Sequence, residues 1–169
     1  MVYNFTGMYG KSDFTKGCGY MRSTVTLKIK KVREGADIPK IATPGSAGMD
    51  ITACIDGEVT VKSGETVGFP TGIAIELPVG FVAFIYARSG LAIKHGLSPA
   101  NCVGVIDSDY RGEIIVGLHN SSADDYVIKP NERIAQLIVG ELPLVTVEEC
   151  EDLSDTLRAA GGFGSTGRM

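Results

Sequence analysis

The sequence lacks the features that mark several large classes of protein. It has no tryptophan, and no apolar run approaches the about 20 residues that a membrane-spanning helix needs. Its four cysteines (Cys18, Cys54, Cys102 and Cys150) include no C-x-x-C pair and have no histidine at metal-ligand spacing. This argues against structural zinc and against a disulfide framework. We therefore expect reduced thiols in a cytoplasm-like compartment.

A surplus of basic residues is also missing. The chain has 16 Lys and Arg against 20 Asp and Glu, a formal net charge of −4, whereas a generic nucleic-acid surface would be basic. Any anionic ligand must therefore be held by a local cluster. No N-terminal segment has the apolar core of a signal peptide. We expect neither a nucleic acid nor a membrane as a partner.

The length and apolar content that are present suit one loop-rich globular domain. The chain has 169 residues, of which 44% are hydrophobic and 22 are glycine. Residues 1–22 are expected to be a flexible extension or an upstream start, and residues 23–153 the folded domain. Residues 154–169 are expected to form a mobile arm, because its closely spaced glycines cannot pack a core and are costly to order.

Short alternating segments predict that the domain is all-β. In T-V-T-L-K-I-K-K-V, period two places Val25, Leu27 and Ile29 on one face. Residues 80–87 are apolar nearly throughout, which predicts burial on both faces, and residues 88–94 are the only expected helix. Turn signals between strands and no βαβ alternation indicate a barrel or a sandwich. The other expected strands cover 50–53, 58–62, 66–77 (two strands), 125–129, 132–139 and 144–148.

The stretch N-C-V-G-V-I-D-S-D-Y-R-G-E (101–113), followed by I-I-V-G-L-H, predicts a β-hairpin. Asp107 stands where the ingoing strand meets the turn, and Tyr110 stands at the tip. Such a bend could hold a flat ring along its backbone edge, with the carboxylate near the far end of the ligand. The alternative is that Asp107 and Asp109 are plain turn residues, because Asp favours turns through local hydrogen bonds.

Three other segments carry groups that suit phosphate. R-S-G (88–90) combines an Arg fork, a hydroxyl and backbone N–H groups at a helix start. G-G-F-G-S-T-G (161–167) offers backbone and hydroxyl donors, with Phe163 placed to stack on a base, but it lacks the Lys-Ser/Thr pair of a P-loop. Gln136 interrupts the apolar run I-A-Q-L-I. The plain alternatives are a turn, a glycine-rich tail, and a core amide or outward-facing strand residue.

Together, five ordered motifs between about residues 25 and 166 resemble the homotrimeric dUTP diphosphatase (dUTPase) family. They are A-T-P-G-S-A-G-M-D-I-T-A (42–53), R-S-G-L-A (88–92), the 101–113 stretch, E-R-I-A-Q-L-I (132–138) and R-A-A-G-G-F-G-S-T-G (158–167). Two departures are small: Ala159 stands where the family often has Gly, and Glu132 replaces a common Asp.

The resemblance implies a jelly-roll-like β-barrel, assembled as a homotrimer with active sites shared between subunits. It implies hydrolysis of dUTP to dUMP and pyrophosphate, which keeps uracil out of DNA and supplies dUMP for thymidylate synthesis. It also implies Mg²⁺ as cofactor, held by the triphosphate and water with no direct ligand from the protein.

The resemblance further assigns roles to single residues. Asp107 would deprotonate the water that attacks the α-phosphorus, Arg88 would support charge from a neighbouring subunit, and Asp50 would organise its motif, with a metal-bound water as one route. Tyr110 would pack beneath the deoxyribose and exclude a 2′-hydroxyl. The remaining implied contacts are Asn101, Gly104, Val105 and Ile106 to uracil, Ser89, Gly90 and Gln136 to phosphate, and Arg158, Phe163, Gly164, Ser165 and Thr166 in the closing arm.

Two rival functions fit parts of the same pattern. A dCTP deaminase shares the barrel but would need a catalytic Glu beside the hairpin, and R-S-G-L-A together with I-D-S-D-Y-R-G-E favours the hydrolase. A nucleotide-sensing interaction protein would bind dUTP and signal by closing its arm. The presence of Asp107, Gln136 and the arm argues against a purely binding role.

Overall fold

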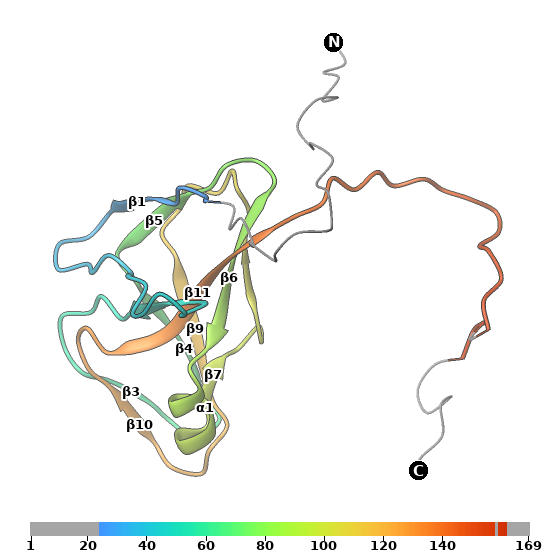
Figure 1. The fold of residues 1–169 in the computed structure, drawn as a ribbon. Coiled ribbons are helices and arrows are strands. Elements are labelled where there is room, and N and C mark those ends of the chain that lie inside the picture. The colour runs from blue at the N-terminus through green and yellow to red at the C-terminus, as the bar shows by residue number, and fades with distance from the viewer. Residues whose placement is uncertain (1–23, 158, 162–169) are drawn as a thin grey trace.

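The computed structural model describes residues 24–157 and 159–161, which form a rolled, all-β body with one short helix (Figure 1). The helix α1 (Ser89–His95) follows β6 directly. The strands are β1 (Lys28–Lys31), β2 (Met49–Thr52), β3 (Val59–Val61), β4 (Thr66–Pro70), β5 (Ile73–Glu76), β6 (Phe81–Ala87), β7 (Leu97–Pro99), β8 (Gly104–Ile106), β9 (Ile115–Asn120), β10 (Tyr126–Ile128) and β11 (Arg133–Glu141).

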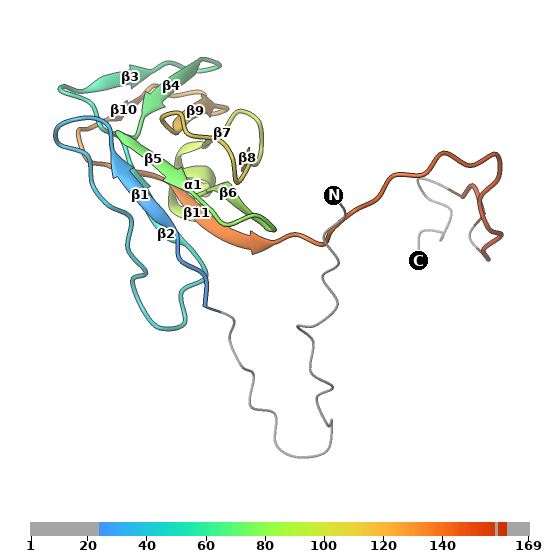
Figure 2. The same ribbon diagram turned by 90° about the horizontal axis from the view of Figure 1, so that it is seen from above.

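The strands pair antiparallel in four small sheets. Their orders are β2-β11-β6-β8, β4-β9-β7, β1-β5 and β3-β10. The last strand, β11, lies between β2 and β6, so strands far apart in the sequence share one sheet. The sheets wrap around a common interior, as the view along the other axis shows (Figure 2).

One hydrophobic core fills the interior. Alternating residues of each strand point inward, as in β9, where Val116, Leu118 and Asn120 are buried and the residues between them are more open. Asn120 is a buried polar residue, and its Nδ2 donates to the carbonyls of Val61 (2.9 Å) and Asp124 (2.8 Å). The largest fully buried side chains are Phe69, Ile51, Ile73, Leu97, Leu118, Ile128, Ile134 and Leu137.

Most of the predicted strands are present within one or two residues, and the predicted short helix is α1. The predicted strand at 144–148 is wrong. The described residues after Glu141 form no strand, and they run away from the body as an extended segment in both ribbon views (Figures 1 and 2). Leu144 is 99% exposed and Val147 90%. The alternating pattern is there, but within the described chain no partner strand lies beside it.

The prediction that β6 is buried on both faces holds only for its first half, where Val82 (2% exposed) and Ala83 (0%) lie on opposite faces, and it fails further along the strand. Ile85 is buried, but Tyr86 is 36% exposed on the opposite face. Phe84 shares that face and lies opposite both Ile138 of β11 and Val105 of β8. This side of the sheet is thus covered only in part: Val82 is buried, Phe84 and Ile138 are half-buried, and Tyr86 and Val105 are exposed. We call these four side chains, Phe84, Tyr86, Val105 and Ile138, the outer apolar face.

Two turn glycines allow the cost of backbone strain to be separated from the cost of close packing. Gly64 and Gly72 both have a left-handed backbone, with φ of +75° and +71°. A Cβ on Gly72 would lie 2.5 Å from the Cβ of Ala36, whereas a Cβ on Gly64 would meet nothing within 4 Å. Alanine costs about 1–2 kcal/mol at either position from backbone strain, and crowding should add about 1–3 kcal/mol at Gly72.

We therefore expect Gly72→Ala to lower the free energy of unfolding clearly more than Gly64→Ala does. Urea denaturation of the two variants and the parent chain measures the difference. Equal losses would contradict the packing argument at Gly72.

Candidate active site

The predicted hairpin at 101–113 is split between two sheets. β8 pairs with β6, where Gly104 lies opposite Ile85, and β9 pairs with β4 from Ile115 to His119. β7 covers the other edge of β9 only from Leu118 to Asn120. The prediction of a β-hairpin is therefore wrong. The turn residues permit a bend, but each strand pairs with another partner. The facing edges of β8 and of the first half of β9 form no ladder, although the Gly117 carbonyl accepts from the Ala100 N–H at 2.8 Å.

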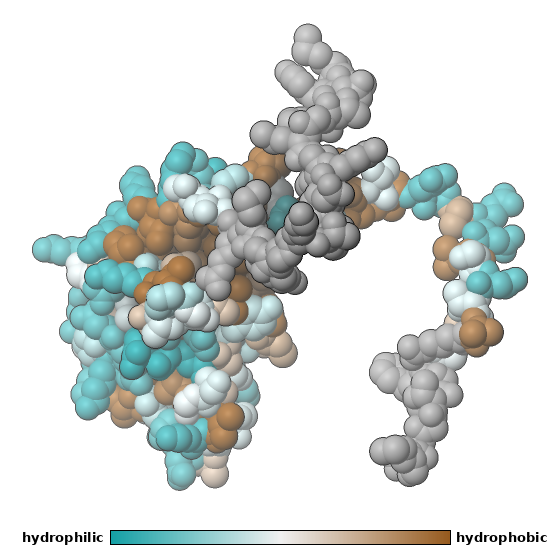
Figure 3. Space-filling model, in the orientation of Figure 1, coloured by the Kyte–Doolittle hydropathy of each residue, from teal (hydrophilic) through white to brown (hydrophobic). Residues whose placement is uncertain are grey.

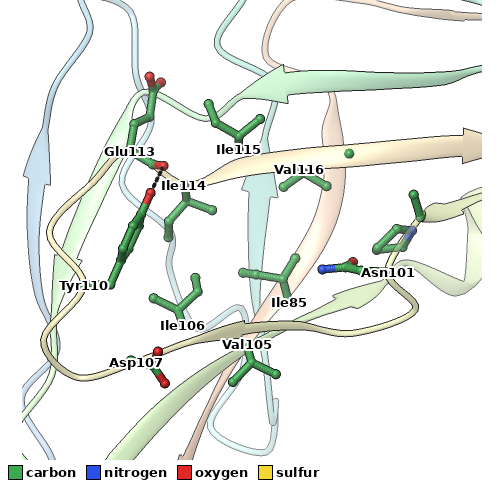
Figure 4. Close-up of a pocket in the computed structure, with 14 residues that line it drawn as sticks. Ile85, Asn101, Val105, Ile106, Asp107, Tyr110, Glu113, Ile114, Ile115 and Val116 are labelled. Carbon is green, nitrogen blue, oxygen red and sulfur yellow. Dashed lines mark hydrogen bonds between the residues drawn. The ribbon is translucent and has the colours of Figure 1, made fainter.

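A pocket of about 420 Å³ lies between these two strands (Figure 4). This volume lies within the range of small-molecule sites, about 300–1,000 Å³. Its walls are mostly aliphatic, and its polar side chains are few and lie toward its ends. It is lined by Ile85, Pro99, Ala100, Asn101, Gly104, Val105, Ile106, Asp107, Tyr110, Glu113, Ile114, Ile115, Val116 and Gly117. All of the residues of this stretch that were predicted to contact substrate line it.

Asp107 and Tyr110 lie at one end of the pocket, and Asn101 lies at the other (Figure 4). The turn from Asp107 to Tyr110 is compact, because the Tyr110 N–H donates to the Asp107 carbonyl at 3.2 Å. Arg111 closes the turn through its Nη1, which donates to the carbonyls of Ser108 (2.7 Å) and Tyr110 (2.9 Å). The Asp107 carboxylate is exposed, so a water molecule and a ligand can both reach it.

A second polar cluster is centred on Asp50. Its Oδ1 accepts from Arg88 Nε at 2.9 Å, and its Oδ2 accepts from Arg133 Nη1 at 3.0 Å. Arg88 also donates to the Arg133 carbonyl at 2.8 Å. Gln136 lies opposite Asp50 in the β2–β11 register, and its Nε2 donates to the Ala87 carbonyl at 3.1 Å. One carboxylate and two guanidinium groups leave the cluster with net positive charge.

Sequence reasoning missed Arg133, although it stands inside the fourth motif next to Glu132. Asp50 has both carboxylate oxygens engaged by arginine. Within residues 24–157 and 159–161, no three Asp, Glu, His or Cys side chains gather closely enough to hold a metal ion. Cys54, Cys102 and Cys150 form no disulfide there. The described chain also has no helix with the length and apolar character needed to cross a bilayer.

The predicted site residues thus fall into two groups. Ser89 and Gly90 open α1 next to the Asp50 cluster, with Arg88 in an extended conformation (φ −86°, ψ 125°) as the residue before the helix. Neither they, Arg88 nor Gln136 line the pocket. The arm residues Arg158, Phe163, Gly164, Ser165 and Thr166 lie outside the described residues.

Glu113 is a further charged residue at the pocket that sequence reasoning did not single out. Its Oε1 accepts from Arg33 Nε at 2.6 Å and from the Gly72 N–H at 2.9 Å. The hydrogen bond from Arg33 lowers the pKa of Glu113 below its ordinary value, burial opposes this, and the Gly72 N–H adds to the lowering. Glu113 directly follows the Y-R-G of the third motif, but Arg33 is 80 residues away, and no local pattern connects them.

Comparison with known proteins gives one consistent result. Residues 34–167 match the family model described as dUTPase. A deoxyuridine 5′-triphosphate nucleotidohydrolase of Desulfitobacterium hafniense (strain DSM 10664 / DCB-2) is 48% identical over 153 residues, which cover 86% of this chain and 98% of the relative.

Two solved structures share the fold. The Staphylococcus bacteriophage 80alpha dUTPase with dUPNHPP has a TM-score of 0.77 at 25% identity, covering 85% of this chain and 99% of that chain. A mutant dUTPase from phage phi11 of S. aureus, described with a structural Mg(II) ion, has a TM-score of 0.70 at 21% identity, covering 77% and 99%. The likeness in fold confirms the predicted jelly-roll-like β-barrel.

The stability of the chain should depend on pH through Glu113. Because its pKa is lower in the folded chain than in the unfolded chain, ionised Glu113 stabilises the fold above the ordinary glutamate pKa of about 4.3. That stabilisation is lost as the pH falls through the folded-state pKa. Near neutral pH, the melting temperature of the parent chain should be a few degrees above that of Glu113→Gln. The two melting temperatures should converge once the pH falls below the folded-state pKa of Glu113. A gap that stays constant in acid would contradict this role.

Proposed function

This chain belongs to the dUTPase family, and from that membership we propose that it hydrolyses dUTP to dUMP and pyrophosphate. The observation that carries the proposal is the opened strand pair, with Asp107 and Tyr110 together at one end of the pocket. The physiological role is removal of dUTP, which keeps uracil out of DNA and supplies dUMP for thymidylate synthesis. A cytoplasmic location belongs to the same proposal.

Uracil would bind between the facing edges of β8 and β9. Backbone N–H and C=O groups there can pair with the polar edge of the base, while Ile106, Ile114 and Val116 bound its faces. Cytosine carries a 4-amino donor where uracil carries an acceptor. In this site that donor would face another donor and stay unpaired, which is a strong basis for rejection.

Asp107 would act as the general base. In this proposal its exposed carboxylate orients a water molecule, accepts the water's proton and directs attack on the α-phosphorus, so that pyrophosphate leaves. Tyr110 would pack beneath the deoxyribose. Such base assistance contributes about 10²–10⁴-fold, so the rest of the rate must come from alignment and from neutralisation of the triphosphate charge.

Phosphate binding is proposed for the group around α1. Arg88, Ser89, Gly90 and Gln136 would hold or neutralise phosphate oxygens, and Asp50 would keep Arg88 in place. The net positive charge of the Asp50 cluster suits a polyanion better than a bare cation. Mg²⁺ would accordingly be held by the triphosphate and water, where it supplies charge neutralisation.

A homotrimer with shared sites is proposed because the single chain leaves its binding groups and its apolar surface incomplete. The residues proposed to bind phosphate do not line the pocket, and the outer apolar face is covered only in part. The segment 142–157 adds exposed Leu144, Val145 and Val147, and Figure 3 shows hydrophobic and hydrophilic residues interspersed along it. Packing this segment on a second copy would bury those side chains and carry the arm (158–167) toward that copy's pocket.

The deaminase alternative is disfavoured by the position of Glu113. It is a glutamate beside the opened strand pair, as a deaminase would need, but its Oε1 is engaged by Arg33 and Gly72. Its side chain also points away from the pocket in Figure 4.

We expect Asp107→Asn to retain dUTP binding and to lose turnover by about 10²–10⁴-fold, because the amide keeps the shape but cannot accept a proton. Asp109→Asn is the matched control, since it removes the neighbouring exposed carboxylate of the same turn. Pyrophosphate and ammonia release from dUTP and dCTP are measured together. Near-normal turnover by Asp107→Asn would exclude the base role, and ammonia from dCTP would indicate the deaminase.

Two truncations should separate assembly from arm closure. Ending the chain after Asp155 removes the arm but keeps most of segment 142–157. That chain should stay trimeric by light scattering and bind nucleotide weakly, while kcat falls by orders of magnitude. Ending the chain after Glu141 removes the whole segment and should also abolish the trimer. Full turnover after the first truncation, or a trimer after the second, would contradict these roles.

A further inference from the structure

The ring of Tyr110 rests on the backbone of the residues that follow Arg111. Its hydroxyl donates to the Glu113 carbonyl at 3.1 Å, the dashed line in Figure 4. A Cβ on Gly112 would collide with that hydroxyl and lie 2.5 Å from Cζ and 3.0 Å from Cε2 of the ring. Tyr110 itself is 46% exposed, so its own packing holds it only in part. The position of the ring therefore depends on residues 112–113.

Glu113 is fixed in turn from the side away from the pocket. Its Oε1 receives both the Arg33 Nε (2.6 Å) and the Gly72 N–H (2.9 Å), and its side chain is only 18% exposed. The two donors come from the loop after β1 and from the β4–β5 turn. Neither donor belongs to the opened strand pair.

The same turn also holds the residue after Glu113. Thr71 donates to the Ile114 carbonyl through both its Oγ1 (2.7 Å) and its N–H (3.2 Å). The Ile114 N–H donates to the Ile73 carbonyl at 2.9 Å. Thr71 and Ile73 are each 1% exposed. Gly72 has no space beside Ala36. The turn is thus part of the packed core and cannot move with the exposed tip at Tyr110.

We propose that Gly112 and Glu113 are positioning residues that set the preference for deoxyribose over ribose. Contacts run from the core turn at residues 71–73, through the Glu113 carboxylate and carbonyl, to the Tyr110 hydroxyl, and Gly112 provides the space in which the ring lies. Neither residue needs to touch the sugar. The inference rests on the proposed function, in which Tyr110 packs beneath the deoxyribose.

The physical reason is that a wall rejects a larger ligand only while the wall cannot yield. Ribose differs from deoxyribose by one hydroxyl, and a pocket that merely has to make room for such a group discriminates by only about 10²-fold. A ring tied to the core by Glu113 holds its position. A ring displaced by a side chain at residue 112, or released by a weakened bond at Glu113, can shift and admit the 2′-hydroxyl.

The test compares kcat/KM for dUTP and for UTP in the full chain. In Gly112→Ala the dUTP/UTP ratio should fall by about 10-fold or more, since the added methyl occupies the place of the ring. Glu113→Gln should lower the ratio less, because the amide retains part of the hydrogen bonding. Most of the kcat for dUTP should persist in both variants. An unchanged ratio in both would overturn the proposal.

The matched control is Glu65→Gln. Glu65 Oε2 accepts the Lys62 N–H at 3.0 Å in the β3–β4 turn, which is the same kind of carboxylate-to-backbone bond as that between Glu113 and Gly72. Its ratio should equal that of the parent chain. A fall as large as that of Glu113→Gln would mean that the ratio reports general loosening of the fold, and this too would overturn the proposal.

A double-mutant cycle shows whether the effect passes through Tyr110. Tyr110→Ala should lower the ratio, and adding Gly112→Ala or Glu113→Gln should then change it no further. Additive losses would overturn the proposal. Tyr110→Phe, which loses only the hydroxyl bonded to Glu113, should resemble Glu113→Gln and serves if Gly112→Ala does not fold.

Calorimetry of dUMP and UMP binding measures the preference for deoxyribose over ribose without any need for turnover. If the parent chain prefers dUMP and the variants lose that preference, the positioning role holds even in a chain that fails to hydrolyse dUTP. If the parent chain hydrolyses dUTP but the variants keep full selectivity in both assays, the proposed function stands and the positioning role of Gly112 and Glu113 is overturned.

Discussion

The site depends on one constraint of strand pairing: β8 and β9 adjoin the same turn but pair with different strands. Had they paired with each other, the backbone groups at residues 104–106 and 115–117 would be used up in a ladder. Because β6 and β4 bind their outer edges, the inner edges face an opening instead, apart from the Gly117 carbonyl, which accepts from the Ala100 N–H. Unpaired backbone groups are costly to bury without partners. They are therefore available to a flat polar ligand that replaces water, and they are already oriented by the sheets behind them.

The charge around Asp50 differs in sign from the net charge of the chain. The chain as a whole is negative, yet the Asp50 cluster carries two guanidinium groups for one carboxylate. Screening at physiological salt limits the reach of exposed charges to about 8 Å, so the local excess of positive charge decides what binds there. In the proposed function, this local charge is what would let a triphosphate bind to a protein whose net charge would repel it.

The described residues also leave apolar surface exposed, at Tyr86 and Val105 and along segment 142–157. The outer apolar face lies on the sheet β2-β11-β6-β8, and segment 142–157 extends from the last strand of that same sheet. This geometry connects assembly to the proposed catalysis. The strand that leads to the arm, β11, also carries Arg133 and Gln136, which belong to or lie beside the Asp50 cluster where phosphate is proposed to bind.

The sequence by itself determined what is local. Side-chain alternation placed nearly every strand, the turn chemistry placed the bend at Asp107–Gly112, and five ordered motifs indicated the family, because each of these depends on neighbours along the chain. Only the tertiary structure decided what depends on proximity in space. It opened the strand pair, left the end of β6 exposed at Tyr86, left 144–148 without a partner strand among the described residues, and brought Arg33 to Glu113 and Arg133 to Asp50. Strand pairing and ion pairing are settled by which segments the fold brings together, and a periodic pattern carries no record of that choice.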